Sequence, residues 1–359
     1  MNEELEDLRK QIDAVDRTLL GLINDRARLA MQIAKVKADS GETGTYYRPD
    51  REANVLKSVL KHNQGPLSDE EMARLAREIM SACLALQQLL RIAFLGPSGT
   101  FTEEAAHKHF GRSIRTLAAD SIDDVFREVE SDNADYGIVP IENSTQGIVN
   151  STLDMFLESA LKIVGEVELQ IRQHLISNAG EASEIDVLYS HQQSLAQCKR
   201  WLATNLPGVK CIPVYSNADA ARRASDEPRA AAIAGEDAAE TYRLPILRKN
   251  IQDAPSNTTR FLIIGKQETG QTGADKTTLL VSTPNKPGAL FGLLQPLAEN
   301  NVSMTRIESR PSHFVNWDYV FFLDLDGHVE NPSVKDSLEA LRAQAGLFKV
   351  LGSYPKAVL

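Results

Sequence analysis

The sequence Ile92-Ala-Phe-Leu-Gly-Pro-Ser-Gly-Thr-Phe101 stands where the residue pattern of the chain changes. Before it, over residues 1–90, hydrophobic residues recur at steps of three and four, which is typical of one face of an α-helix. Residues 92–101 begin as a short apolar strand and run through a glycine-containing turn into a helix pattern. Strands and helices then alternate up to about residue 270. We therefore expect an all-α domain followed by a two-lobed α/β domain.

Length, charge and cysteine content exclude several classes of protein. At about 100–200 residues per domain, the 359 residues predict two or three domains. A net charge of −10 argues against a nucleic-acid partner or an anionic membrane, since both require basic surfaces. The cysteines Cys83, Cys198 and Cys211 form no C-x-x-C pair, so neither a disulfide framework nor a zinc site is expected. Secretory-signal, membrane-span and G-x-G-x-x-G patterns are absent, so we expect a cytoplasmic protein without metal or cofactor.

The first predicted helix is unusually long. It covers residues 5–36, and Gly41 and Gly44 are expected to end it. At 1.5 Å per residue, about 35 residues span roughly 50 Å, which is longer than a small domain is wide. Pro49 is expected to begin a second helix, and residues 68–71 supply a capping box for a third. Because such a long helix packs poorly alone, we expect a homodimer or a higher homo-oligomer.

Basic residues on the first helix are spaced to hold an anion. Arg26 and Lys37 are eleven residues apart, and eleven steps of 100° return to within about 20° of the start, so both face one way. They lie about 16 Å apart along the axis, and their long side chains can bracket a small anion. Arg9 lies about 25 Å from Arg26. It can join this pocket only from a second, antiparallel chain.

The helical segment resembles the all-helical chorismate mutases. The resemblance rests on five motifs in order, at residues 8–13 (LRKQID), 25–26 (DR), 35–37 (KVK), 48–52 (RPDRE) and 86–88 (LQQ). In that family the dimer swaps helices, and one arginine of each site comes from the partner. The reaction is a pericyclic rearrangement, which requires a held conformer and donors to the ether oxygen but no nucleophile.

This resemblance implies roles for individual residues. Arg9 of the partner subunit, Arg26 and Arg51 would hold the two carboxylates of chorismate. Lys37 and Gln87 would face the ether oxygen. The remaining expected pocket residues are Glu52 at the ring hydroxyl, Cys83 where some members carry serine, and Arg48 where some carry aspartate.

Four polar clusters in the α/β segment adjoin its predicted strands. They are residues 96–101 (GPSGTF), 140–147 (PIENSTQG), 190–193 (SHQQ) and 257–261 (NTTRF). Polar residues at the carboxyl ends of strands are where α/β proteins usually bind ligands. Glycines in the first cluster leave backbone N–H groups to face an anion at a helix N-terminus. The ordered set resembles prephenate dehydratases, in which two lobes close over the substrate at a hinge cleft.

The dehydratase resemblance implies Thr259 as the most important catalytic residue, with Arg260 beside it. Prephenate must lose carbon dioxide and its ring hydroxyl, so a proton donor to that hydroxyl assists the reaction. Arg260 would bind a carboxylate directly or set the hinge. His191 has two open roles, in the cleft or as a hydrogen-bonded structural residue at a strand end. The other expected cleft residues are Ser98, Gly99, Thr100, Glu142, Asn143, Ser144, Thr145, Ser190, Gln193 and Phe261.

The last segment follows a polar, glycine-rich linker at residues 266–275. Its pattern is the ferredoxin-like order βαββαβ. Residues 285–290 (NKPGAL) and 308–311 (ESRP) resemble ACT-type regulatory domains, which bind phenylalanine between paired domains. A helix N-terminus suits the carboxylate of that ligand, and Glu308 is expected to meet its amino group. The implied effector residues are Pro287, Gly288, Ala289, Leu290, Glu308, Ser309 and Arg310.

Together these features resemble the bifunctional chorismate mutase/prephenate dehydratase family with a C-terminal ACT domain. The expected domains are residues 1–90 (all-α, helix-swapped), 91–268 (two-lobed α/β, periplasmic-binding-protein-like) and 276–359 (ferredoxin-like α+β). The family implies conversion of chorismate through prephenate to phenylpyruvate, in phenylalanine biosynthesis and under feedback inhibition by phenylalanine. Two alternatives remain open: a monofunctional dehydratase whose helical segment only dimerises, and a non-enzymatic two-lobed binding protein.

Overall fold

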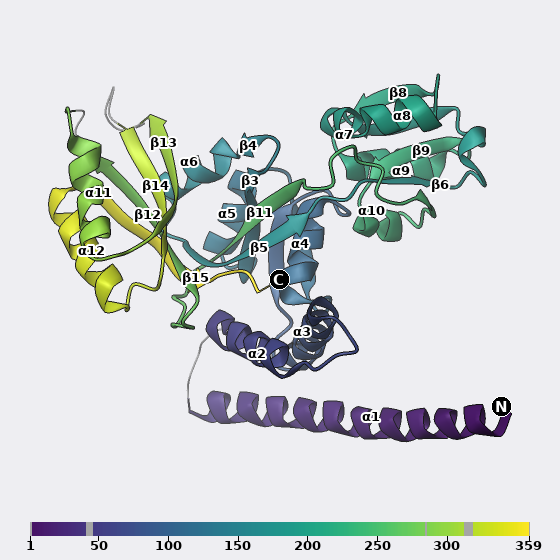
Figure 1. Ribbon diagram of the computed structural model, residues 1–359, viewed down its shortest axis with the longest axis horizontal. Coiled ribbons are helices and arrows are strands. Elements are labelled where there is room, and N and C mark those ends of the chain that lie inside the picture. The colour runs from purple at the N-terminus through teal and green to yellow at the C-terminus, as the bar shows by residue number, and fades with distance from the viewer. Residues whose placement is uncertain (1, 41–45, 284–285, 312–318, 359) are drawn as a thin grey trace.

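The computed structural model describes residues 2–40, 46–283, 286–311 and 319–358. Gly41 and Gly44, the expected end of the first helix, lie outside these residues, as does Asn285 of the NKPGAL motif. Figure 1 shows a helical part, two lobes that each contain a sheet, and a C-terminal domain of helices on a sheet. The multidomain order expected from the sequence is therefore confirmed.

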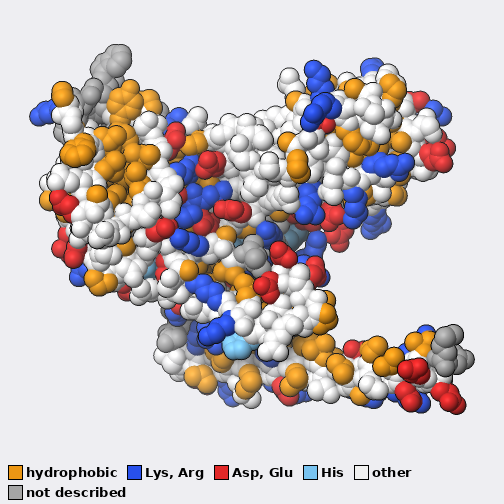
Figure 2. All heavy atoms as spheres, in the orientation of Figure 1, with side chains coloured by type: hydrophobic (Ala, Val, Ile, Leu, Met, Phe, Trp, Pro, Cys, Tyr) orange, Lys and Arg blue, Asp and Glu red, His pale blue; other side chains and the backbone are white. Residues whose placement is uncertain are grey.

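The N-terminal part consists of three helices, α1 (Asn2–Asp39), α2 (Pro49–His62) and α3 (Asp69–Ala85). The Ser68 hydroxyl accepts a hydrogen bond from the Glu71 N–H at 3.3 Å, so the predicted cap of α3 is confirmed. Helix α1 runs along the edge of the molecule (Figure 1). Its apolar residues Leu8, Ile12 and Val15 are 52, 60 and 64% exposed, and Figure 2 shows hydrophobic side chains along its length. This apolar face is uncovered within the protomer.

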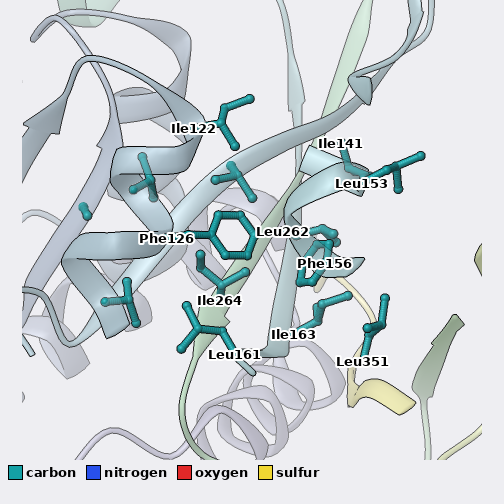
Figure 3. Packing of buried hydrophobic residues seen from close by; sticks show 14 of the residues in the cluster. Ile122, Phe126, Ile141, Leu153, Phe156, Leu161, Ile163, Leu262, Ile264 and Leu351 are labelled. Carbon is teal, nitrogen blue, oxygen red and sulfur yellow. The ribbon is translucent and has the colours of Figure 1, made fainter. Parts of the chain in front are cut away.

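The first lobe is a mixed sheet in the order β2-β1-β3-β11-β5, with β4 added to β3. Strand β1 runs parallel to β2 and β3, whereas β11 runs antiparallel to β3 and β5. Phe126 and Phe156 meet edge to face in its core, with ring centroids 5.2 Å apart (Figure 3). The elements are β1 (Arg91–Leu95), α4 (Phe101–Phe110), β2 (Arg115–Ala119), α5 (Ile122–Glu130), β3 (Tyr136–Asn143), β4 (Gly147–Ile148), α6 (Asn150–Glu158), β5 (Lys162–Gln170) and β11 (Thr258–Gly265).

The second lobe is a five-stranded sheet in the order β10-β6-β9-β7-β8. Its central strand β9 is made of alanines and one isoleucine, all buried, so helix α9 packs closely on it. The elements are β6 (His174–Ser177), the 3-10 turn η1 (Ala182–Glu184), β7 (Val187–His191), α7 (Gln192–Gln197), α8 (Lys199–Asn205), β8 (Lys210–Val214), α9 (Asn217–Asp226), β9 (Ala230–Ala234), α10 (Glu236–Thr241) and β10 (Ile246–Arg248).

Two connections join the lobes, one from β5 to β6 and one from β10 to β11. They hydrogen-bond to each other, since the Ile171 N–H donates to the Asn257 carbonyl and the Ile251 N–H to the Gln173 carbonyl, both at 2.8 Å. The first lobe is thus completed only when the chain returns in β11. This return carries the NTTRF motif to the boundary between the lobes.

The C-terminal domain has the expected order βαββαβ, with an antiparallel sheet in the order β13-β14-β12-β15. Strand β15 lies against β5 of the first lobe, and Leu351 joins the core of that lobe (Figure 3). The polar segment before β12 is also docked, since Thr269 is 7% exposed and its carbonyl is bonded to His328. The elements are β12 (Asp275–Thr283), α11 (Ala289–Glu299), β13 (Met304–Pro311), β14 (Tyr319–Asp326), α12 (Pro332–Gln344) and β15 (Leu347–Pro355).

Candidate active site

The basic residues expected to bind chorismate on α1 lie on an exposed helix. Arg9 and Arg26 are exposed, and Lys37 is half-buried. The Lys37 ammonium lies 5.6 Å from the ring centroid of Tyr46, over its face. One protomer therefore presents Arg26 on an exposed surface of α1, with Lys37 partly covered by Tyr46 and Arg9 far along the same helix.

The other residues expected in the same pocket lie in or next to α2 and α3 and differ in exposure and partners. Arg51 is exposed, and Arg48 is paired with Asp50 at 3.0 Å. Glu52 instead faces Arg77 of α3, with 3.5 Å between carboxylate and guanidinium. Cys83 is 3% exposed, and Gln87 is half-buried.

Glu52 lies at a buried junction between the helices and the first lobe. A small cavity there, about 40 Å³, is lined by Glu52, Tyr47, Arg77 and His109 and by the C-terminal residues 355–358. Burial raises the pKa of Glu52 to about 7, although Arg77 opposes the rise. Burial and Arg77 lower the pKa of His109 to about 3, so its ring is neutral. The structure thus joins Glu52 to the dehydratase lobe, a placement that the helical pattern did not predict.

A cavity of about 450 Å³ lies between the two lobes of the α/β domain. Residues from all four polar clusters line it, as the sequence predicts for a hinge cleft. The lining residues among those expected are Thr100, Asn143, His191, Gln193, Thr259 and Phe261.

The Asn143 amide and the Thr259 hydroxyl form a hydrogen-bonded pair in the wall of this cavity. Asn143 Nδ2 donates to Thr259 Oγ1 at 2.7 Å and to Asn257 Oδ1 at 2.9 Å. The side-chain oxygen Asn143 Oδ1 accepts from the N–H and the hydroxyl of Thr145, at 3.0 and 2.6 Å, which holds the amide in one orientation. Because the Thr259 oxygen accepts the bond from Asn143, its own hydrogen remains available to a ligand.

The second lobe contributes a network that sequence reasoning missed. Asn217 Oδ1 accepts from the His191 N–H at 3.0 Å and from the Ser190 hydroxyl at 3.2 Å. Asn217 Nδ2 donates to Ser194 Oγ at 2.8 Å, and Gln173 Nε2 donates to the same oxygen at 3.0 Å. Gln173 and Ser194 follow predicted strands closely, and this position after a strand was the only available signal.

His191 combines the two roles that its sequence position left open. Its ring lines the cleft. Its Nδ1 accepts a hydrogen bond from the Gln193 N–H at 3.4 Å, so it also caps the N-terminus of α7.

The GPSGTF turn is organised differently from the expectation. The Gly99 N–H donates at 2.6 Å to the carboxylate of Glu103, which is 6% exposed. The Ser98 carbonyl accepts from the Tyr242 hydroxyl at 3.1 Å. The anion at the Gly99 N–H is therefore supplied by the protein itself, and Gly96, Thr100 and Phe101 are the residues of this turn that line the cleft.

Glu142 and Arg260, expected to bind substrate, are directed away from the cleft. In the β3–β11 ladder Asn143 pairs with Thr259, and Glu142 pairs with Arg260. Successive side chains of a strand point to opposite faces, so the second pair occupies the back of the sheet. Arg260 there contacts Glu166 and Asp324, so of its two expected roles, direct binding of a substrate carboxylate is the one that this position does not provide.

The residues expected to bind an effector lie at two positions of the C-terminal domain. Gly288 precedes α11 and has φ +79°, a left-handed conformation that favours glycine. Pro287 and Gly288 are exposed, whereas Ala289 and Leu290 are half-buried. On β13, Ser309 is exposed and Glu308 is half-buried. Arg310 is bonded at 2.6 Å to Asp154 of helix α6, so its guanidinium bridges to the dehydratase lobe.

Comparison with known proteins agrees with the division into a helical part, a two-lobed α/β part and a C-terminal domain. Sequence profiles described as "Chorismate mutase type II", "Prephenate dehydratase" and "ACT domain" match residues 8–88, 92–269 and 277–343. The "Bifunctional chorismate mutase/prephenate dehydratase" of Pseudomonas aeruginosa is 53% identical over 363 residues, covering 99% of each chain. The protein of that name from Neisseria gonorrhoeae is 49% identical and covers 98% of this chain and 97% of its own.

Two solved structures are each similar to about three quarters of this chain. Prephenate dehydratase from Arthrobacter aurescens in complex with L-Phe has a TM-score of 0.68 and 34% identity, covering 74% of this chain and 90% of its own. GqqA, described as a novel type of quorum quenching acylase, has a TM-score of 0.69 and 28% identity, covering 75% and 98%.

Fold, cleft and comparisons define a prephenate dehydratase joined to a chorismate mutase domain and an ACT domain. Among the residues that the structure describes, no helix is both long and apolar enough to span a membrane, and no cluster of potential metal ligands is found. The chain belongs to the family of bifunctional chorismate mutase/prephenate dehydratases.

Proposed function

We propose that this enzyme rearranges chorismate to prephenate on its helical domain and converts prephenate to phenylpyruvate in the cleft between its lobes. The observation that supports the second step is the Asn143–Thr259 pair in the cleft wall. When the ring carboxylate leaves as carbon dioxide, its bonding electron pair moves through the ring and expels the hydroxyl as hydroxide, which takes a proton from solvent to become water. The Thr259 hydroxyl donates a hydrogen bond to this departing oxygen and stabilises its developing negative charge.

The lobes would close over prephenate about the two paired connections, as in periplasmic binding proteins. His191 and Gln193 then approach the substrate from the second lobe, where Asn217 holds the backbone of His191. We propose that neither step uses a metal or a cofactor, because the rearrangement needs only a held conformer and hydrogen-bond donors, and the elimination needs a donor to the departing oxygen and no electron acceptor.

The mutase half requires a second copy of the chain. An antiparallel partner would cover the exposed apolar face of α1 and bring its Arg9 to Arg26 and Lys37. In the proposed site Arg26 and Arg51 hold carboxylates, and Lys37 and Gln87 stabilise the ether oxygen. Glu52 serves the ring hydroxyl, for which it leaves Arg77, its partner in the protomer, when chorismate binds. Arg48 and Cys83 complete the expected lining.

The ACT domain is proposed to bind phenylalanine, the amino acid formed from phenylpyruvate, and to inhibit the cytoplasmic enzyme. Residues 287–290 would bind its carboxylate at the N-terminus of α11, and Glu308 and Ser309 its amino end. Support comes from the solved dehydratase whose description includes L-Phe.

The test is an assay of the purified chain on chorismate and on prephenate without added cofactor. Thr259→Ala should lower dehydratase turnover by about 10²–10³-fold and leave mutase turnover unchanged, because one donor to a developing oxyanion is removed. Lys37→Ala should do the reverse, and Thr259→Ser, which keeps the hydroxyl, is the control.

Each alternative function predicts a different result. Wild-type activity on prephenate alone would favour the monofunctional dehydratase. Inactivity on both compounds would favour a binding protein, and loss of both activities from either substitution would contradict two separate sites.

A further inference from the structure

The catalytic pair lies on one face of a two-strand ladder whose other face contacts the ACT domain. Asn143 and Thr259 are register partners, and the neighbouring partners are Glu142 and Arg260. Side chains alternate along a strand, so each cleft residue is followed or preceded by one on the back of the sheet. A displacement of the back pair therefore moves the front pair with it.

Arg260 is held by a buried network across the domain boundary. Its Nη1 contacts Asp324 of β14 at 2.6 Å, its Nη2 the hydroxyl of Tyr354 of β15 at 3.1 Å, and its Nε Glu166 of β5 at 2.8 Å. Glu166 also accepts from Lys276 of β12 at 2.7 Å. The Arg260 side chain is 12% exposed, and those of Glu166 and Asp324 are 3% and 5% exposed. Two cations and two anions are thus neutralised together, as buried charges require.

Glu142, the other member of the back pair, is held by the same domain. Arg306 of β13 lies 3.4 Å from its carboxylate, and the Arg306 side chain is 16% exposed. Arg306 precedes Glu308 by two residues and therefore lies on the same face of β13. Strand β13, which is proposed to contact the effector, therefore also contacts Glu142, on the face of the β3–β11 ladder opposite Asn143 and Thr259.

We propose that Glu142, Arg260, Arg306 and Asp324 form a back-face clamp through which the ACT sheet positions Asn143 and Thr259. The clamp rests on the proposed function, since Thr259 must be the dehydratase group. Its members touch no reacting atom, so they are positioning residues. A small displacement of a catalytic donor costs turnover steeply, up to about 10²-fold for 1 Å.

The clamp is tested with Arg306→Gln and Asp324→Asn in the full chain. Each should lower dehydratase kcat by about tenfold and change KM for prephenate less than about twofold, because positioning fails while substrate contacts remain. Arg306→Lys, which keeps the charge, should recover part of the lost kcat. Mutase turnover should stay at the wild-type level and reports that the variants are folded.

The chain offers a matched control in Asp154→Asn. Asp154 is also a carboxylate of the dehydratase lobe paired with an arginine of β13, and its side chain is 38% exposed against 41% for Glu142. Asp154 lies on α6 and not on β3 or β11, the strands that carry Asn143 and Thr259, so kcat should remain within twofold of wild type.

Three outcomes would overturn the clamp. They are wild-type kcat in both clamp variants, an effect on KM alone, and an equal loss of kcat in Asp154→Asn. A wild-type enzyme without dehydratase activity would instead refute the proposed function, so the two failures are distinguishable.

Discussion

The buried carboxyl group of Glu52 should make stability depend on pH. It lies at the junction of α2, α3 and the first lobe, with its side chain 15% exposed. Burial raises its pKa to about 7 from an ordinary value of 4.5, and Arg77 offsets part of the effect. Between these two values the folded chain keeps the Glu52 proton, whereas the unfolded chain releases it.

The sign and size of the effect follow from this difference. The contribution of Glu52 is fully present below pH 4.5 and is lost as the pH rises through about 7. A pKa difference of about 2.5, at about 1.4 kcal/mol for each unit, corresponds to about 3 kcal/mol of unfolding free energy. Glu52→Gln remains uncharged at every pH and so removes this pH-dependent contribution to the unfolding free energy.

The measurement is the unfolding free energy from urea titrations between about pH 4.5 and 8. Over this range wild type should lose about 3 kcal/mol more than Glu52→Gln does. Glu71→Gln is the control, because Glu71 is an exposed residue of α3 paired with Arg74. Parallel profiles for wild type and Glu52→Gln would refute the reasoning, and so would an equal change in the Glu71 variant.

Two further substitutions test the packing that supports the cleft. A Cβ at Gly352 would lie 2.1 Å from the Ile163 carbonyl oxygen, so Gly352→Val should separate β15 from β5. The unfolding free energy should fall by about 1–3 kcal/mol, with a lower thermal midpoint, and unchanged melting would contradict this contact. Phe156→Ala removes a side chain that is 1% exposed and packed on Phe126, and calorimetry should show a loss of about 3–5 kcal/mol; a loss below about 1 kcal/mol would show that the core collapses around the cavity.

Local sequence features predicted the elements and the cleft motifs well. Helix α1, the cap of α3 and the βαββαβ order follow from periodicity and capping, which depend on residues only a few positions apart. The cleft location of Thr259 and Asn143 was predictable because polar residues at strand ends gather at one edge of a sheet.

The direction in which individual side chains point was harder to predict from the sequence. The dehydratase resemblance implies that Glu142 lines the cleft and that Arg260 binds a carboxylate or sets the hinge. Strand alternation places sequence neighbours on opposite faces, but only the tertiary structure reveals which face lines the cleft, and that Asp324 of another domain contacts Arg260. The Gly99 N–H was likewise expected to face a ligand, whereas tertiary packing directs Glu103 to it.

By itself, then, the sequence determined the three kinds of domain, their order and the cleft motifs, because these are encoded in short-range patterns. Residues 92–101 correctly marked the change from helices to an α/β lobe. The tertiary structure decided which residues share a surface: Glu52 with Arg77, Asn217 with His191, and Arg260 with Asp324. Such contacts join residues 25 to more than 60 positions apart, and sheet register and domain docking, rather than local propensity, bring them together.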